Sequence, residues 1–149
     1  MLEAMKYVGC WVSDQDEAVA FYTEKLGFEV REDVTFGEGD SYRWLIVGPA
    51  GDAGPGLILS RPGPPAMDEE TGKQVLELVA KGAMGGGIFH AADCRATCVE
   101  LEKRGLELTQ QPEERFYGID AAFRDPAGNQ WRIVQPTEYD EEAMKKFSG

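Results

Sequence analysis

The sequence is poor in the residues that metal sites and nucleic-acid surfaces need. It has one histidine, His90, and three cysteines among 149 residues, and 27 Asp and Glu outnumber 15 Lys and Arg. The formal charge of −12 leaves no basic surface to pair with phosphates, so we expect binding neither to nucleic acid nor to an anionic membrane. An iron site built from two histidines and a carboxylate is excluded by the single histidine.

Long apolar runs and common catalytic motifs are also missing. The sequence has no run of 18 apolar residues, so we predict no membrane-spanning helix. The first residues, MLEAMKYVGCWV, lack the basic start and the long apolar core of a secretion signal. An odd number of cysteines without such a signal favours reduced thiols and a cytoplasmic location. Neither GxSxG nor a phosphate-binding P-loop occurs.

What the chain does contain is an internal repeat. EKLGFEV at Glu24–Val30 returns as EKRGLEL at Glu102–Leu108. Each copy places a glycine where a helix ends in a left-handed residue, followed by apolar residues that start a strand. Ser13 or Asp14, then Asp68 and Asp93, are positioned as N-caps of three helices. The repeat therefore predicts the same helix-to-strand joint in each half of the chain.

The order of predicted elements is also the same in both halves: strand, helix, strand, strand, strand. The predicted strands are Tyr7–Val12, Phe28–Thr35, Tyr42–Val47 and Leu57–Ser60, then Ile88–Ala92, Leu106–Thr109, Ile119–Arg124 and Trp131–Val134, with QPEERFYG as a turn-rich segment and DPAGN as a tight turn. We predict one α+β domain, 1–149, of two βαβββ modules forming a curled mixed sheet around a cleft. The modules span 5–60 and 87–136, a connector with a helix spans 61–86, and a C-terminal tail helix lies in 137–149.

Two longer motifs add a family resemblance to this pattern. VSDQDEAVAFYTEKLGFEV and FRDPAGNQWRIVQP, with the repeat between them, resemble the vicinal oxygen chelate superfamily over roughly Met5 to Pro136. That superfamily holds glyoxalases, bleomycin-resistance proteins and extradiol dioxygenases. The resemblance implies that each module curls into a half-barrel, that the cleft holds a metal or a ligand, and that the protein forms a homodimer. It leaves open whether the modules pair within one chain or between chains.

The family's metal-binding places carry residues that do not bind metals. By the resemblance these places fall on Tyr7, Ile58, Gly87 and Arg132. Ile and Gly have no donor atom, Arg stays cationic, and a lone Tyr is a poor ligand. We therefore expect no metal and no cofactor. Strand alternation from Gly87 points His90 away from the cleft.

The same alternation predicts which side chains line the cleft. It selects Tyr7, Trp11, Ile58, Ser60, Phe89, Asp120 and Arg132 as ligand-binding residues, and it leaves open whether Trp44 or Arg43 faces inward. The alternative for Tyr7 and Trp11 is that they pack the barrel and bind no ligand. The alternative for Arg132 and Asp120 is that they pair with each other and bind nothing.

Three functions fit these residues. The first is a metal-independent protein that binds an aromatic or cationic small molecule, as bleomycin-resistance proteins do. The second is a glyoxalase- or dioxygenase-like enzyme with a relocated or absent metal site, in which Tyr7, Asp120 and Arg132 serve as acid, base and anion holder. The third is a regulatory domain with a vestigial cleft. The sequence identifies neither the ligand nor a catalytic residue.

Overall fold

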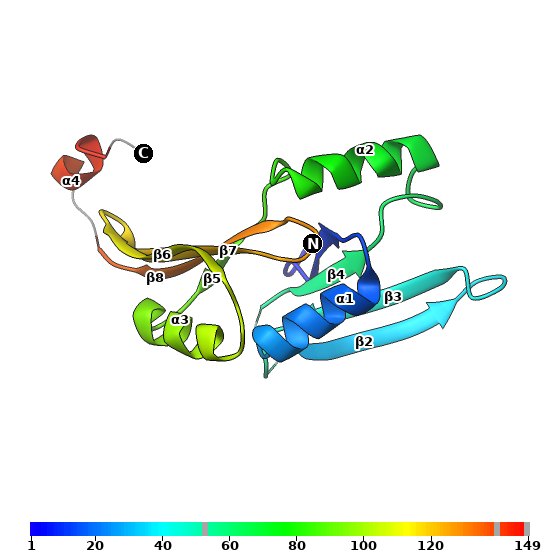
Figure 1. The fold of residues 1–149 in the computed structure, drawn as a ribbon, viewed down its shortest axis with the longest axis horizontal. Coiled ribbons are helices and arrows are strands. Elements are labelled where there is room, and N and C mark those ends of the chain that lie inside the picture. The colour runs from blue at the N-terminus through cyan, green and yellow to red at the C-terminus, as the bar shows by residue number, and fades with distance from the viewer. Residues whose placement is uncertain (52–53, 139–140, 148–149) are drawn as a thin grey trace. The chain divides into compact units, whose positions relative to one another are not determined.

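The computed structural model describes residues 1–51, 54–138 and 141–147, which form two compact units (Figure 1). The first unit comprises Met1–Gly85 together with Asp125–Asn129, and the second comprises Gly86–Arg124 and Gln130–Gly149. In each unit one four-stranded mixed sheet carries the repeat that the sequence predicts, so the α+β fold class is confirmed.

The first unit contains four strands, two α-helices and one π-helical turn. Its sheet has the order β1-β4-β3-β2, with β1 parallel to β4 and the other pairs antiparallel. The bounds are β1 Tyr7–Trp11, α1 Gln15–Ala20, η1 Phe21–Lys25, β2 Glu29–Phe36, β3 Tyr42–Gly48, β4 Gly56–Ser60 and α2 Glu69–Ala80.

The second unit repeats this topology with the order β5-β8-β7-β6, again with one parallel pair, β5 with β8. The bounds are β5 Ile88–His90, α3 Cys94–Lys103, β6 Leu108–Arg115, β7 Gly118–Arg124, β8 Gln130–Pro136 and α4 Glu141–Lys145. Among the described residues, no helix is long and apolar enough to cross a membrane.

Short-range signals in the sequence fix the helix ends. The side chains of Asp14, Asp68 and Asp93 each accept a hydrogen bond from a backbone N–H three residues on, so all three predicted N-caps are confirmed. Gly27 and Gly105 adopt φ angles of 71° and 93°, which are left-handed values that glycine adopts without strain. The repeated phrase is therefore the C-terminal stop of a helix in each unit.

The segment predicted to be turn-rich is mostly strand. In QPEERFYG, β6 continues to Arg115, and the turn is confined to Phe116 and Tyr117 before β7. β6 is the edge strand of the second sheet and pairs with β7. Proline has no N–H to donate, but at the edge of a sheet no second neighbouring strand needs that donor. The register shifts between Gln110 and Glu113 absorb the proline.

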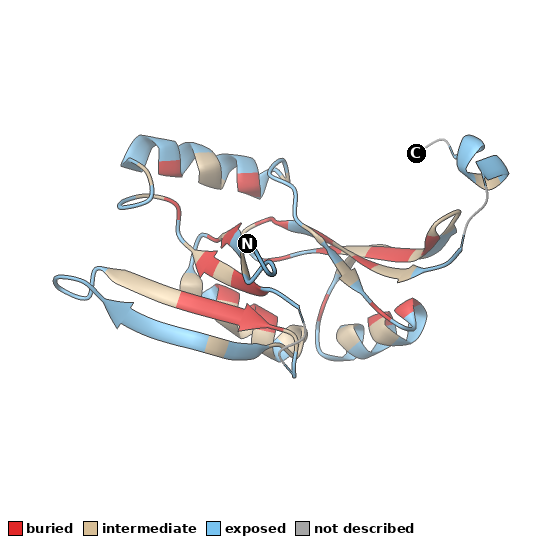
Figure 2. Cartoon of the chain, turned by 180° about the vertical axis from the view of Figure 1, so that it is seen from behind, coloured by how far each residue is buried: buried red, intermediate tan, exposed pale blue. Residues whose placement is uncertain are grey.

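The buried residues lie mainly on inner strands, whereas the edge strand β2 is almost wholly exposed (Figure 2). In the first unit Leu45, Val47 and Leu59 are completely buried, as is Tyr22 of η1. In the second unit the buried core is formed by Ala121, Phe123, Ile133, Cys94 and Cys98. Each sheet thus has one apolar face closed by packing.

The DPAGN turn anchors to the first unit through a buried carboxylate. Asp125 is 5% exposed and accepts hydrogen bonds from Tyr22 Oη at 2.7 Å, Asn129 N at 2.9 Å and Asn129 Nδ2 at 2.8 Å. Asn129 Nδ2 also donates to the Trp11 carbonyl at 2.8 Å. Burial is the main reason that the pKa of Tyr22 lies well above its usual value, so its hydroxyl remains a donor.

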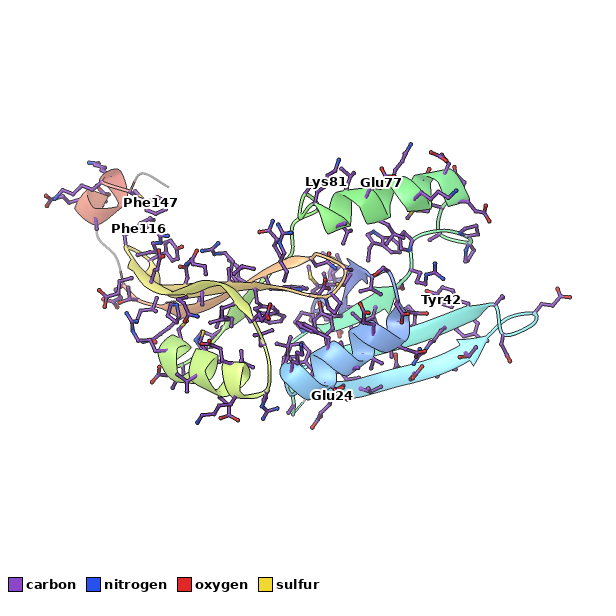
Figure 3. The ribbon with its side chains drawn as sticks, in the orientation of Figure 1. Glu24, Tyr42, Glu77, Lys81, Phe116 and Phe147 are labelled. Atoms are coloured by element: carbon purple, nitrogen blue, oxygen red, sulfur yellow. The ribbon has the colours of Figure 1, made fainter. Side chains whose placement is uncertain are left out.

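The C-terminal segment packs on its own unit through aromatic rings. The Phe147 ring lies toward Phe116, with centroids 5.0 Å apart, and both residues are labelled in Figure 3. The acidic start of the predicted tail helix lies partly outside the described residues, and α4 begins at Glu141.

Candidate functional site

Four of the predicted ligand-binding residues lie together on one face of the first sheet. Tyr7, Trp11, Ile58 and Ser60 are brought there by the parallel register of β1 and β4, in which Gly9 pairs with Ile58 and Trp11 pairs with Ser60. All four are half-buried. We call this face the open face, because the opposite one carries Leu45, Leu57 and Leu59 and contacts α1.

The structure settles which residue of β3 joins them. Ile46 pairs with Ile58, so Trp44, two residues earlier, has its side chain on the open face. Arg43 points the other way and forms ion pairs with Asp33 at 2.9 Å and Asp16 at 2.7 Å. The hydrogen bonds with Asp33 and Asp16 raise the pKa of Arg43 and hold it in a structural role.

A carboxylate that sequence reasoning missed completes the group. Glu32 Oε2 accepts hydrogen bonds from Trp44 Nε1 at 2.6 Å and from Tyr7 Oη at 3.3 Å. The Tyr7 and Trp44 rings meet edge to face with centroids 5.6 Å apart. We call Tyr7, Trp44 and Glu32 the open-face cluster.

Glycines make room for this cluster. Gly56 pairs with Tyr7, and a Cβ there would come within 2.5 Å of Ile46 Cγ2 and 3.4 Å of the Tyr7 ring. A Cβ on Gly48 would meet the Arg31 guanidinium at 2.3 Å. The absence of a side chain at Gly56 therefore leaves room for Ile46 beside Tyr7, and its absence at Gly48 leaves room for the Arg31 guanidinium.

A hollow borders the cluster within the same unit. It has a volume of about 660 Å³ and is lined by residues 1–7, Arg31, Glu32 and Gly54. Ligand pockets are commonly roughly 300–1,000 Å³. Arg31 spans part of its wall by donating to the carbonyls of Gly54 at 3.0 Å and Pro49 at 3.2 Å.

Apolar side chains continue the open face toward the far end of β2 and β3. Val34 pairs with Trp44, and Phe36 pairs with Tyr42. Val34 and Phe36 are 54% and 51% exposed, and the Phe36 ring lies 5.2 Å from that of Tyr42, which Figure 3 labels. A flat apolar molecule would therefore find ring edges and aliphatic surface side by side on this face.

The predicted residues Asp120 and Arg132 form a network in the second unit. Asp120 is completely buried, and its Oδ2 accepts hydrogen bonds from Arg132 Nε at 3.0 Å and from Tyr117 Oη. Gln110 Nε2 donates to Asp120 Oδ1 at 2.9 Å, and Arg132 Nη2 donates to Gln110 Oε1 at 3.0 Å. The pairing of Asp120 with Arg132, which the sequence offered as the alternative to ligand contact, is the arrangement found.

These donors control the charge of Asp120. Burial alone would raise its pKa, but the hydrogen bonds from Tyr117, Arg132 and Gln110 outweigh burial, and the pKa lies below the usual value. Burial and the bond to Asp120 raise the pKa of Tyr117. Asp120 is thus a fixed anion with its oxygens already engaged.

The predicted orientation of β5 is wrong. Ile88 pairs with Arg132 and His90 pairs with Val134, so His90 shares the face of Arg132 while Phe89 lies on the opposite one. The Phe89 ring packs 4.8 Å from Trp131 and 6.3 Å from Phe123, in the buried core. Gly87 also faces that side, because a Cβ there would lie 2.9 Å from the Trp131 ring.

The residues at the family's metal-binding places do not fit a divalent ion. The Tyr7 hydroxyl donates to Glu32, Ile58 has no donor atom, and Arg132 is a cation bound to Asp120. Within the described ranges, no group of three His, Cys, Asp or Glu is placed to hold an ion. The donor groups at these places therefore do not support metal chemistry.

The cysteines offer no nucleophile in the folded protein. All three are free and buried. Burial, reinforced by the nearby charge of Asp125, raises the pKa of Cys10 to about 12, and burial raises that of Cys98 to about 12. Thiols that stay protonated are poor nucleophiles, and Cys10 belongs to the core as its strand position predicts.

Comparison with known proteins supports the family that the motifs suggested. The family model described as Glyoxalase/Bleomycin resistance protein/Dioxygenase superfamily matches residues 4–133. An uncharacterised protein of Shewanella frigidimarina (strain NCIMB 400) is 31% identical over 138 residues, which cover 91% of this chain and 95% of that protein.

Two solved structures are similar along nearly their whole length. UcmS2 is 44% identical, with a TM-score of 0.83, covering 91% of this chain and 99% of that one. TnmS3, described as an antibiotic binding protein from Streptomyces sp. CB03234, is 29% identical, with a TM-score of 0.69, covering 91% and 98%.

Proposed function

Because the chain belongs to the glyoxalase/bleomycin resistance protein/dioxygenase superfamily, we propose that it is a metal-independent protein that binds an aromatic or cationic small molecule. The ligand lies on the open face of the first sheet, against Tyr7, Trp44, Trp11 and Ile58. The observation that carries this proposal is the open-face cluster, in which two half-buried aromatic rings and a carboxylate are held in one fixed arrangement. Similarity to TnmS3, an antibiotic binding protein, supports a small-molecule ligand.

Metal independence rests on the donor chemistry of the four family places. Those on the first sheet, Tyr7 and Ile58, offer a hydroxyl engaged by Glu32 and an aliphatic side chain. The aromatic and aliphatic surface that replaces the ligands supplies apolar contact, which contributes about 25 cal/mol for each Å² removed from water. A ligand held in this way needs no ion to bridge it to the protein.

The enzymatic alternative has less support in the geometry. A general base needs a free lone pair within reach of the proton it takes. Asp120, the base in that hypothesis, is completely buried and accepts from Tyr117, Arg132 and Gln110. Its lowered pKa also makes it a weak base. These contacts favour binding over catalysis.

We also propose that the protein is a cytoplasmic homodimer. The family resemblance implies the dimer, and the three free cysteines suit a reducing compartment. Light scattering at micromolar concentration should report twice the monomer mass of 16.4 kDa; the monomer mass alone would contradict this.

Thermal denaturation with excess EDTA tests the binding function. A flat aromatic ligand at about 100 times its dissociation constant adds about 2.7 kcal/mol. At about 2–4 °C for each kcal/mol in a chain of this size, Tm should rise by about 5–10 °C. Trp44→Ala should remove the rise, whereas Phe147→Ala, which truncates an exposed ring outside the open face, should keep it. A rise that needs added Zn²⁺ or Ni²⁺ would overturn metal independence.

A further inference from the structure

We propose that Glu32 binds a cationic group of the ligand and that the ammonium of Lys6 competes for the same place in the free protein. This inference rests on the proposed function and assigns the chemical class of the ligand: a flat aromatic molecule that carries an ammonium or a similar hydrogen-bonding cation. The proposal starts from the three contacts around Tyr7.

The Glu32 carboxylate is held in position before any ligand arrives. Oε2 accepts two hydrogen bonds, one from the indole of Trp44 at 2.6 Å and one from the hydroxyl of Tyr7 at 3.3 Å. Within the described residues Oε1 accepts no hydrogen bond, and the residue is exposed. A carboxylate is an acceptor only, and its strongest partners are cationic N–H donors.

The two rings strengthen the same preference. Tyr7 and Trp44 meet at an interplanar angle of 85°, so an edge of one faces the surface of the other. The surface of an aromatic ring attracts a cation within about 6 Å of its centroid, and the attraction grows when water is excluded. A carboxylate between two such rings therefore favours a cation over a neutral or anionic group of the same size.

The chain itself places a cation in this environment. Lys6 Nζ lies 5.2 Å from the centroid of the Tyr7 ring. Lys6, Tyr7 and Glu32 all line the hollow of about 660 Å³. A ligand cation entering the hollow would meet the face of Tyr7 that the ammonium of Lys6 covers, so the two positive charges cannot both occupy it without repulsion.

The other charges around the hollow are accounted for. Arg31 directs its guanidinium to the carbonyls of Pro49 and Gly54, where it holds the loop before β4. Glu3 and the α-amino group of Met1 also belong to the residues that line the hollow. Lys6 is a cation of this lining that contacts the open-face cluster through an aromatic ring.

Three probes with one ring system test the charge preference. They are 2-naphthylmethylammonium, 2-naphthylmethanol and 2-naphthylacetate, which differ mainly in the charge of the side group. Calorimetric titration of the full chain in low salt with EDTA should rank them in that order of decreasing affinity. We expect the ammonium to bind about tenfold more tightly than the alcohol, in line with a hydrogen bond to a charged group.

Matched variants locate the preference. Glu32→Gln keeps the shape and an acceptor oxygen for Trp44, and it should lower the affinity for the ammonium about tenfold while sparing the alcohol. Glu38→Gln removes an equal charge from the exposed turn before β3 and should change neither. Lys6→Gln should tighten ammonium binding about threefold. Its control is Lys25→Gln, which removes an equal charge and an equal contact, since Lys25 Nζ lies 5.7 Å from the Phe21 ring.

Each outcome decides between the claims. Equal binding of all three probes, or the same loss from Glu32→Gln as from Glu38→Gln, overturns the role of Glu32 and leaves the proposed function standing. A Lys6→Gln variant that binds no more tightly than Lys25→Gln overturns the competition by Lys6. If no probe binds the wild-type chain, the proposed function fails together with this inference.

Discussion

Removal of the Asp125 carboxylate should destabilise the protein more than the loss of any other single polar group in the first unit. Asp125→Ala takes away the acceptor of Tyr22 Oη, Asn129 N, Asn129 Nδ2 and Gly128 N. Two of these donors keep another partner: Gly128 N donates to the Asp125 carbonyl at 3.0 Å, and Asn129 Nδ2 donates to the Trp11 carbonyl at 2.8 Å. The Tyr22 hydroxyl and the Asn129 backbone N–H each lose a charged acceptor, and Cys10 Sγ, 3.8 Å from the Tyr22 hydroxyl, is a weaker one.

The magnitude follows from those two donors. A buried donor left without its acceptor costs about 1–3 kcal/mol, so the free energy of unfolding should fall by about 2–6 kcal/mol. At about 2–4 °C for each kcal/mol in a chain of this size, Tm should fall by roughly 4–24 °C. Tyr22→Phe removes only one bond and leaves Asp125 its other donors, so its cost should be about 1–2 kcal/mol.

Urea denaturation of both single variants and of the double variant forms the test. Phenylalanine has no hydroxyl to strand, so Tyr22→Phe should be nearly neutral or stabilising in the Asp125→Ala background. Additive losses in the double variant, or an Asp125→Ala protein as stable as wild type, would refute the account of this carboxylate as the buried anchor of the turn.

Three further outcomes are expected. The pKa of Asp120 is lowered in the fold, so its stabilising contribution is present above its unfolded value and is lost as the pH falls below about 4; Asp120→Asn should therefore be less stable than wild type at pH 7, with the gap in Tm narrowing at pH 3, and a constant gap would contradict this. An alkylating reagent at pH 8 should modify none of Cys10, Cys94 and Cys98 in the native protein and all three after denaturation, counted by mass spectrometry; rapid native labelling would contradict their burial. Zn²⁺, Ni²⁺ or Fe²⁺ should leave Tm almost unchanged in a melting experiment, whereas a shift of several degrees that His90→Ala removes would point to a metal site.

The helix ends and the order of helices and strands along the chain were predictable because their signals are local. An aspartate N-cap accepts a hydrogen bond from a backbone N–H only three residues later, as Asp14 does, so it does not depend on tertiary contacts. Gly27 and Gly105 end helices because glycine adopts left-handed φ angles without strain. Strand alternation likewise brought Tyr7, Trp11, Ile58 and Ser60 to one face. Their role in ligand binding stays a prediction.

Errors arose where pairing overrides local pattern. β5 has three residues, too few for alternation to fix its orientation, and its register is set by β8. Burial of the Phe89 ring against Trp131 and Phe123 determines which side faces the core. Pro112 marked a turn by its local preference, but an edge strand tolerates it.

Glu32 could not be found from its neighbours in sequence. Its partner Tyr7 lies on β1, at the opposite edge of the sheet with β4 and β3 between, and a register shift between Val30 and Glu32 interrupts the alternation of β2. Gly56, which pairs with Tyr7, leaves room for the Ile46 side chain beside the Tyr7 ring. Only the pairing of all four strands reveals that a carboxylate joins the two rings.

The most direct test of the binding claim uses the three indole N–H groups of the protein, those of Trp11, Trp44 and Trp131. A ¹H–¹⁵N NMR titration of the EDTA-treated protein with 2-naphthylmethylammonium reports each indole separately. The open-face site predicts that the signals of Trp44 and Trp11 shift with saturation, while that of Trp131, buried in the core of the second unit, stays in place. Unchanged signals from Trp44 and Trp11 at saturating probe, or shifts that appear only after a divalent metal is added, would contradict a metal-independent site on this face.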